Sequence, residues 1–205
     1  MRKLWLAVLV LALGGTSVAS AQTLGLPVFQ SPYRAFKSNE LGATFSDPGD
    51  GLSWALEGQY RRADRRGRFD WGLRFAYADP EGKGGDGVFG VGADVRAPIA
   101  RHTQEFPLDA SFTAGFGALF SNGNSGFLVP IGVTLGRQVM LENSSISFVP
   151  YVHPVLAPAF GDLFDDVQFG LGLGVDINLS RTWDARIGGA VGDLDGFGIG
   201  FAWHR

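Results

Sequence analysis

The stretch FGLGLGVDINL, residues 169–179, separates into two faces with a period of two. Its odd positions carry bulky apolar residues, and its even positions carry Gly170, Gly172, Gly174, Asp176 and Asn178. A strand keeps such alternating sets on opposite faces, whereas a helix would spread both sets around its circumference. The stretch therefore predicts a β-strand with one apolar face and one face of glycine and polar residues.

The same alternation recurs along most of the chain and predicts ten strands. We place them at 39–47, 52–61, 68–78, 87–97, 106–120, 126–137, 144–156, 167–179, 183–192 and 196–204. The first strand is short, and the seventh contains Pro150 and Pro154, which cannot donate ladder hydrogen bonds. Loss of those two strands would leave eight, which is the alternative.

The two faces differ in a way that indicates a membrane. The apolar face carries large aliphatic and aromatic side chains, and the other carries mostly glycine, alanine and serine with isolated charges. A soluble barrel would turn its large residues inward, whereas a transmembrane barrel turns them toward lipid. We therefore expect an all-β fold, a closed antiparallel up-and-down transmembrane β-barrel, with Phe112, Phe116, Leu171 and Leu173 on its outside.

The first residues have the pattern of an export signal. Arg2 and Lys3 precede an apolar run from Leu4 to Leu13, and Ala19-Ser20-Ala21 supplies a cleavage site. The run is shorter than the roughly 20 residues of a spanning helix. We predict a signal peptide over 1–21, an N-terminal periplasmic segment over 22–38 and the barrel over 39–205.

Composition narrows the function classes. Without Arg2 and Lys3, the chain keeps 15 basic residues against 20 acidic ones, a net charge of −5. Nucleic-acid binding needs a basic face, so we do not expect it. The chain has no cysteine, so no disulfide framework holds it.

The connections separate by charge. In an up-and-down barrel they alternate between the two ends, and acidic residues gather in odd-numbered connections, as at Asp79, Glu81 and Asp86. Arginines gather in even-numbered ones, as at Arg65 and Arg66. The separation supports an even strand number, with ten favoured. Outer-membrane barrels keep both termini on the periplasmic side, and this rule, rather than the charges, places the basic turns in the periplasm and the acidic loops outside.

Several charges fall on the inward face of the predicted strands. They are Glu57, Arg61, Asp70, Arg74, Asp94, Arg96, Asp176 and Arg186. The expected turns set Glu57 opposite Arg74, Arg61 opposite Asp70, and Asp176 opposite Arg186. Opposed pairs lower the cost of burying charge, so we interpret them as a salt-bridge plug that fixes strand register. A selectivity element in a pore is the alternative.

Aromatic residues cluster near both ends of the predicted strands. Tyr60, Trp71, Trp183 and Trp203 fall near the basic end, and Tyr77 and Phe120 fall near the acidic end. We interpret them as the aromatic girdles of a membrane barrel.

These features resemble the small barrels of Gram-negative outer membranes, of the outer-membrane protein A transmembrane-domain and outer-membrane protein X type. The terminal GIGFAW, residues 198–203, is similar to the family's assembly signal, although His204 and Arg205 follow it. The resemblance implies that Gly198, Phe201 and Trp203 are read by the barrel-assembly machinery. It also implies export through the translocon and an outer-membrane location among lipids, and we expect a monomer.

Three functions are compatible with this reading. The first is a structural or interaction role in the cell envelope, and the second is a narrow passive channel for ions or small solutes. The third is a lipid-modifying enzyme built on His153, but the sequence offers no nucleophile at short spacing from it. We therefore expect no catalytic residues, no metal and no cofactor.

Overall fold

The computed structural model describes Leu24 and residues 29–33, 38–48, 52–81, 85–164, 166–194 and 196–205. Within these residues no helix is long and apolar enough to cross a membrane. The strands are β1 (Glu40–Asp47), β2 (Leu52–Ala63), β3 (Asp70–Pro80), β4 (Val88–Ala100), β5 (Asp109–Ser121), β6 (Asn124–Leu128), β7 (Ile131–Gly136), β8 (Val139–Met140), β9 (Ser147–Ala157), β10 (Ala159–Gly161), β11 (Gln168–Asn178), β12 (Trp183–Gly192) and β13 (Gly196–His204).

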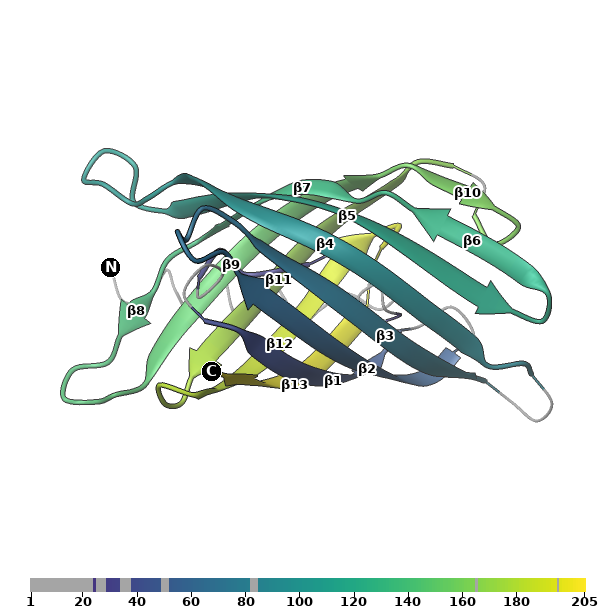
Figure 1. The fold of residues 1–205 in the computed structure, drawn as a ribbon, viewed down its shortest axis with the longest axis horizontal. Coiled ribbons are helices and arrows are strands. Elements are labelled where there is room, and N and C mark those ends of the chain that lie inside the picture. Colours follow the sequence, from purple (N-terminus) through teal and green to yellow (C-terminus); the bar gives the residue numbers. More distant parts are fainter. Residues whose placement is uncertain are drawn as a thin grey trace.

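These segments form a closed antiparallel barrel of ten strands (Figure 1). β6 and β7 are two parts of one strand, and so are β9 and β10, because the hydrogen bonding continues across the gaps. The N–H of Val129 donates to the carbonyl of Pro158 and that of Gly115 donates to the carbonyl of Pro130, each at 2.9 Å. β8 extends the hairpin between β7 and β9. Pairing of β1 with β13 and of β5 with β7 closes the ring.

The fold class, the strand number and the approximate strand positions are confirmed. The short first strand and the proline-containing seventh both take part in the barrel, so eight strands is wrong. The seventh strand also runs farther than expected, through β10.

The two faces point as expected. Phe112, Phe116 and Leu173 lie outside, with 39 to 47 % of their surface exposed, whereas Glu57 and Asp176 face the bore and are buried. Leu52 is an exception to the predicted outward stripe. A β-bulge in β2 between Leu52 and Trp54 reverses the alternation and turns Leu52 into the bore.

The segment before β1 corrects a second expectation. Of the predicted periplasmic segment 22–38, the described residues Leu24, Phe29, Gln30 and Ser31 lie inside the barrel and are buried. A ten-strand bore is wider than the eight-strand bore that wall side chains alone can fill, and this segment occupies part of the extra space. The predicted signal peptide, 1–21, lies outside the described residues.

The barrel has a basic end, where the chain enters β1 and leaves β13. Asn39 and Arg205 exchange two backbone hydrogen bonds there, of 2.9 and 3.0 Å. The other end carries the loops after β1, β3, β5, β10 and β12 and is acidic.

Candidate functional site: the bore of the barrel

A network of ion pairs fills the basic half of the bore along β2, β3 and β4. Arg74 contacts Glu57 at 2.7 Å and Asp94 at 3.4 Å. Arg61 contacts Asp94 at 2.6 Å and also pairs with Asp70. Arg96 completes the network through Asp70 at 2.9 Å. All six side chains are less than a tenth exposed, so each charge relies on its partners rather than on bulk water.

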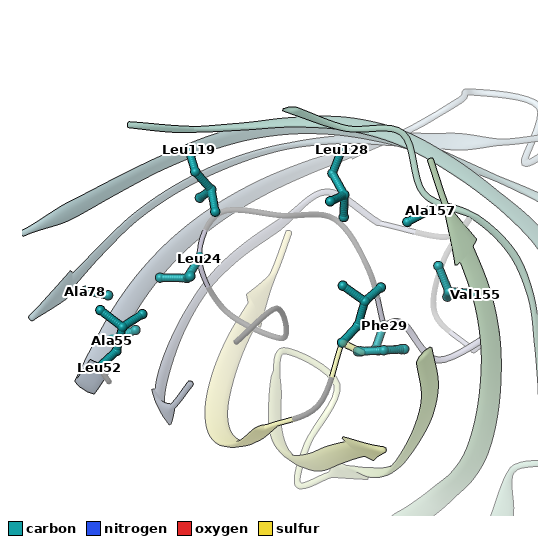
Figure 2. Packing of buried hydrophobic residues seen from close by; sticks show 10 residues of the cluster. Leu24, Phe29, Leu52, Ala55, Ala78, Leu119, Leu128, Val155 and Ala157 are labelled. Atoms are coloured by element: carbon teal, nitrogen blue, oxygen red, sulfur yellow. The ribbon is translucent and has the colours of Figure 1, made fainter. Parts of the chain in front are cut away.

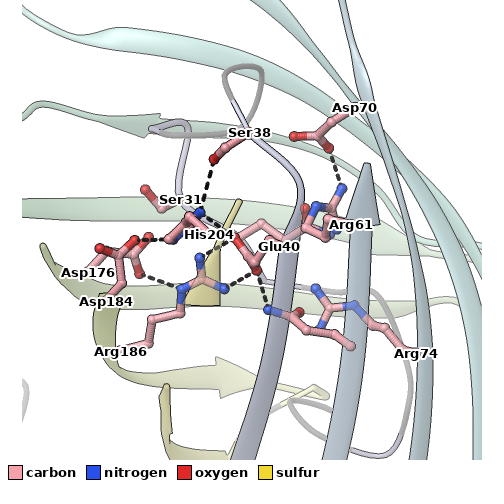
Figure 3. Close-up of polar contacts among 12 residues, drawn as sticks. Ser31, Ser38, Glu40, Arg61, Asp70, Arg74, Asp176, Asp184, Arg186 and His204 are labelled. Carbon is pink, nitrogen blue, oxygen red and sulfur yellow. Dashed lines mark hydrogen bonds and ion pairs between the residues drawn. The ribbon is translucent and has the colours of Figure 1, made fainter. Parts of the chain in front are cut away.

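A second cluster continues the polar filling across β1 and β12 (Figure 3). The guanidinium of Arg186 donates to both oxygens of Glu40, at 2.6 and 2.7 Å, and lies 3.7 Å from Asp176. Gln59 donates to Glu40 from β2 at 2.6 Å. The bidentate contact between Arg186 and Glu40 is the strong form of a charge-assisted hydrogen bond.

The register of the β2–β3 hairpin corrects two predicted pairs. Gln59, not Glu57, lies opposite Arg74, and Gly72, not Asp70, lies opposite Arg61. The turn is centred one residue later than expected, which shifts each partner by two positions. Ion pairs still form because the arginine side chains reach diagonally along the same face. On the other side of the barrel, Asp176 lies opposite Arg186 as predicted.

Apolar side chains fill the acidic half of the bore (Figure 2). Leu52, Leu119, Leu128 and Leu194 are buried there, each no more than 9 % exposed, together with Leu24 from the N-terminal segment. Leu194 lies on the loop after β12, so a connection as well as the wall contributes to this filling. The bore is therefore closed twice, by apolar packing toward the acidic mouth and by ion pairs toward the basic one.

His153 on β9 is buried in the bore with both ring nitrogens engaged. Its Nδ1 accepts the backbone N–H of Gln30 at 2.8 Å, so the proton belongs on Nε2. Nε2 then donates to Oγ1 of Thr113 at 2.8 Å. A ring in this state holds neighbouring groups in place and has no free nitrogen with which to take a proton from a nucleophile.

The space left in the polar half is small. A cavity of about 70 Å³ lies among Phe29, Gln59, Arg61, Tyr151 and Arg186. That volume accommodates a few water molecules, whereas pockets for small organic ligands are typically about 300–1,000 Å³.

The predicted aromatic and C-terminal residues lie on the outer wall and the closing strand. Tyr60 packs edge-on against Trp71 with ring centroids 5.9 Å apart, and Trp183 lies opposite Trp203. At the acidic end Phe120 lies opposite Phe89, whose ring is 5.1 Å from that of Tyr77. Gly198, Phe201 and Trp203 belong to β13, which pairs with both β1 and β12.

Sequence reasoning missed Gln30, Glu40, Asp184 and His204. His204 is buried and its Nε2 lies 2.7 Å from Asp184. The alternation of inward and outward side chains along β1 could have indicated Glu40, and the same alternation along β12 could have indicated Asp184. No periodic signal precedes β1, so the position of Gln30 had no sequence indicator.

The comparisons with known proteins show a likeness in fold only. No protein-family model matches the chain, and no curated protein matches it. Among solved structures, the β domain of the Bordetella autotransporter BrkA is similar, with a TM-score of 0.50 and 18 % identity over 82 % of this chain and 99 % of that one. The KdgM porin gives a TM-score of 0.42 and 6 % identity over 80 % of this chain and 98 % of that one. The closed ten-strand barrel and the likeness to the BrkA β domain together show the fold of outer-membrane β-barrels, while the specific likeness to the outer-membrane protein A and X type stays a prediction.

Proposed function

We propose that this chain is an outer-membrane barrel with a structural or interaction role, and that its bore is closed to solutes in the resting state. The observation that carries the proposal is the double filling of the bore, which leaves a polar cavity of about 70 Å³. The apolar exterior supports insertion in lipid, and the interior ion pairs support a rigid wall. The closing strand β13 is where assembly machinery would act.

Electrical recording tests the closed bore. The mature chain, residues 22–205, is refolded in detergent, checked for heat-dependent gel mobility and inserted into planar lipid bilayers. We expect the heat-dependent shift of a folded barrel and no stepwise current. Steady porin-like conductance from the wild-type chain would overturn the proposal in favour of a passive channel, the second candidate, which the water-sized cavity among the charges supports.

A further inference from the structure

The bore holds a part of the chain that belongs to no strand. Leu24 and Phe29 come from the N-terminal segment and are 2 % and 8 % exposed (Figure 2). Leu24 lies in the apolar half, in one cluster with Leu52 and Leu119, and Phe29 in the same cluster lies beside Leu194. The segment thus enters the apolar filling before the chain reaches β1 at the basic end.

Glycines of the wall make room for this segment. A Cβ at Gly172 would lie 2.2 Å from Cδ1 of Phe29, and one at Gly170 would lie 2.8 Å from its Cζ. A Cβ at Gly90 would lie 1.5 Å from the carbonyl oxygen of Leu24. Non-bonded heavy atoms do not approach one another so closely, so any side chain at these three positions would displace the segment or the wall. The glycines of β11 and β4 therefore form a cradle that fits it.

Polar contacts tie the same segment to two separate parts of the wall. The amide of Gln30 donates from its side chain to Asp94 on β4 at 2.9 Å, and its backbone N–H donates to His153 on β9 at 2.8 Å. Arg96 on β4 donates to the carbonyl of Ser31 at 2.8 Å. A short peptide thus bridges strands that do not pair with each other, as a bound ligand would.

We infer that the inner wall of β4, β9 and β11 is a binding site for a peptide segment. Leu24 and Phe29–Ser31 of the same chain occupy it in cis as a plug. When they withdraw, the space that they occupied becomes a water-filled passage past Asp94, Arg96 and His153. The inference goes beyond the proposed function, which requires a closed bore but not a detachable occupant.

Disulfide trapping tests the docked position. A Cβ at Gly172 lies 3.0 Å from Cβ of Phe29, close enough for a disulfide after a small adjustment, and the chain has no other cysteine. We expect the Phe29→Cys/Gly172→Cys protein, folded in lipid vesicles, to lose both free thiols on mild oxidation while staying monomeric. The matched control is Phe29→Cys/Gly58→Cys, because Gly58 faces outward with nothing within 4 Å. Equal thiol labelling of the two proteins after oxidation would overturn the inference.

Conductance tests the withdrawal. We expect the Leu24→Ala/Phe29→Ala/Gln30→Ala variant to keep the gel shift of a folded barrel and to show stepwise openings in planar bilayers, where wild type shows none. A synthetic peptide with the sequence of residues 22–33 should block these openings, and the same peptide with alanine for Phe29 and Gln30 should not. A folded variant that stays silent would overturn the inference yet leave the closed-barrel proposal standing. Conductance of wild type itself would overturn that proposal, whatever the trapping result.

Discussion

Arg74 shows at the scale of one residue what the buried charges do. Its guanidinium lies between Glu57 at 2.7 Å and Asp94 at 3.4 Å, and its side chain is 8 % exposed. Removing one member of a buried ion pair is costly because the remaining charge keeps its desolvation penalty. Arg68, by contrast, pairs with Asp64 at 3.4 Å on the surface and is 65 % exposed.

We expect Arg74→Met to lower the free energy of unfolding by about 3–5 kcal/mol, because two buried carboxylates lose the cation between them. Arg68→Met is the matched control and should cost less than about 1 kcal/mol. Urea titration in lipid vesicles, followed by tryptophan fluorescence, measures both. Similar losses for the two variants would contradict a stabilising network in the bore.

How far sequence predicts the site depends on the residue. Period-two parity predicts that Arg74, Asp94 and Asp176 face inward, because a strand leaves a side chain only two directions. Parity cannot say which inward groups meet: Glu40 pairs with Arg186, 146 positions away, and only closure of the barrel brings them together. Gln30 lies outside any strand, so no alternation constrained it.

At the scale of one element, the seam between β7 and β9 is interrupted. Ile131 and Gly132 pair with β9, and so do Leu135 and Gly136, but the residues between them do not. The N–H of Arg137 donates to the carbonyl of Pro150 at 3.4 Å, so the edge of β9 that carries Pro150 faces β7.

The period of two puts the ring nitrogen of Pro154 on that same edge. The other edge of β9 pairs with β11 without a break from Ser147 to Ala157. The prolines therefore remove donors from one ladder only, which explains why the strand tolerates both.

We expect Pro154→Val to strengthen this seam, because it restores a backbone N–H donor on the edge of β9 that faces β7. The side chain at this position lies outside the bore, so the replacement leaves the filling of the bore unchanged. Replacing a proline also raises the conformational entropy of the unfolded chain, which lowers the stability of the folded state. The control is therefore Pro107→Val in the exposed turn after β4, which has the same entropic cost but gains no new hydrogen bond. The stability of Pro154→Val should exceed that of the control by about 0.5–1.5 kcal/mol. Amide hydrogen exchange in β7 should slow as well. Unchanged exchange would show that the missing donor does not weaken the seam.

At the scale of the whole molecule, sequence alone indicated a closed barrel of ten strands because two independent patterns agreed. Alternation set the strands, and the separation of acidic from basic connections required them to be even in number. Part of the filling of the bore could not be predicted, for a physical reason. Strand patterns describe the wall and its inward side chains, whereas Leu24, Phe29 and Leu194 come from the N-terminal segment and a loop, which have no periodicity.

The medium around the barrel can be tested at Phe75, in the middle of β3 with 63 % of its surface exposed. In water, a substitution at so exposed a site should change stability by no more than about 0.5 kcal/mol. In lipid, Phe75→Arg should cost about 2–4 kcal/mol, because the charge enters the hydrocarbon near its midplane. Phe106→Arg in the turn after β4, where 43 % of the side chain is exposed, should cost about 0–1 kcal/mol at the interface. Urea titration in vesicles therefore distinguishes the two media. A large loss of unfolding free energy at Phe75 with a small loss at Phe106 requires hydrocarbon around the middle of the barrel. Equally small losses at both positions would contradict a barrel that spans the membrane.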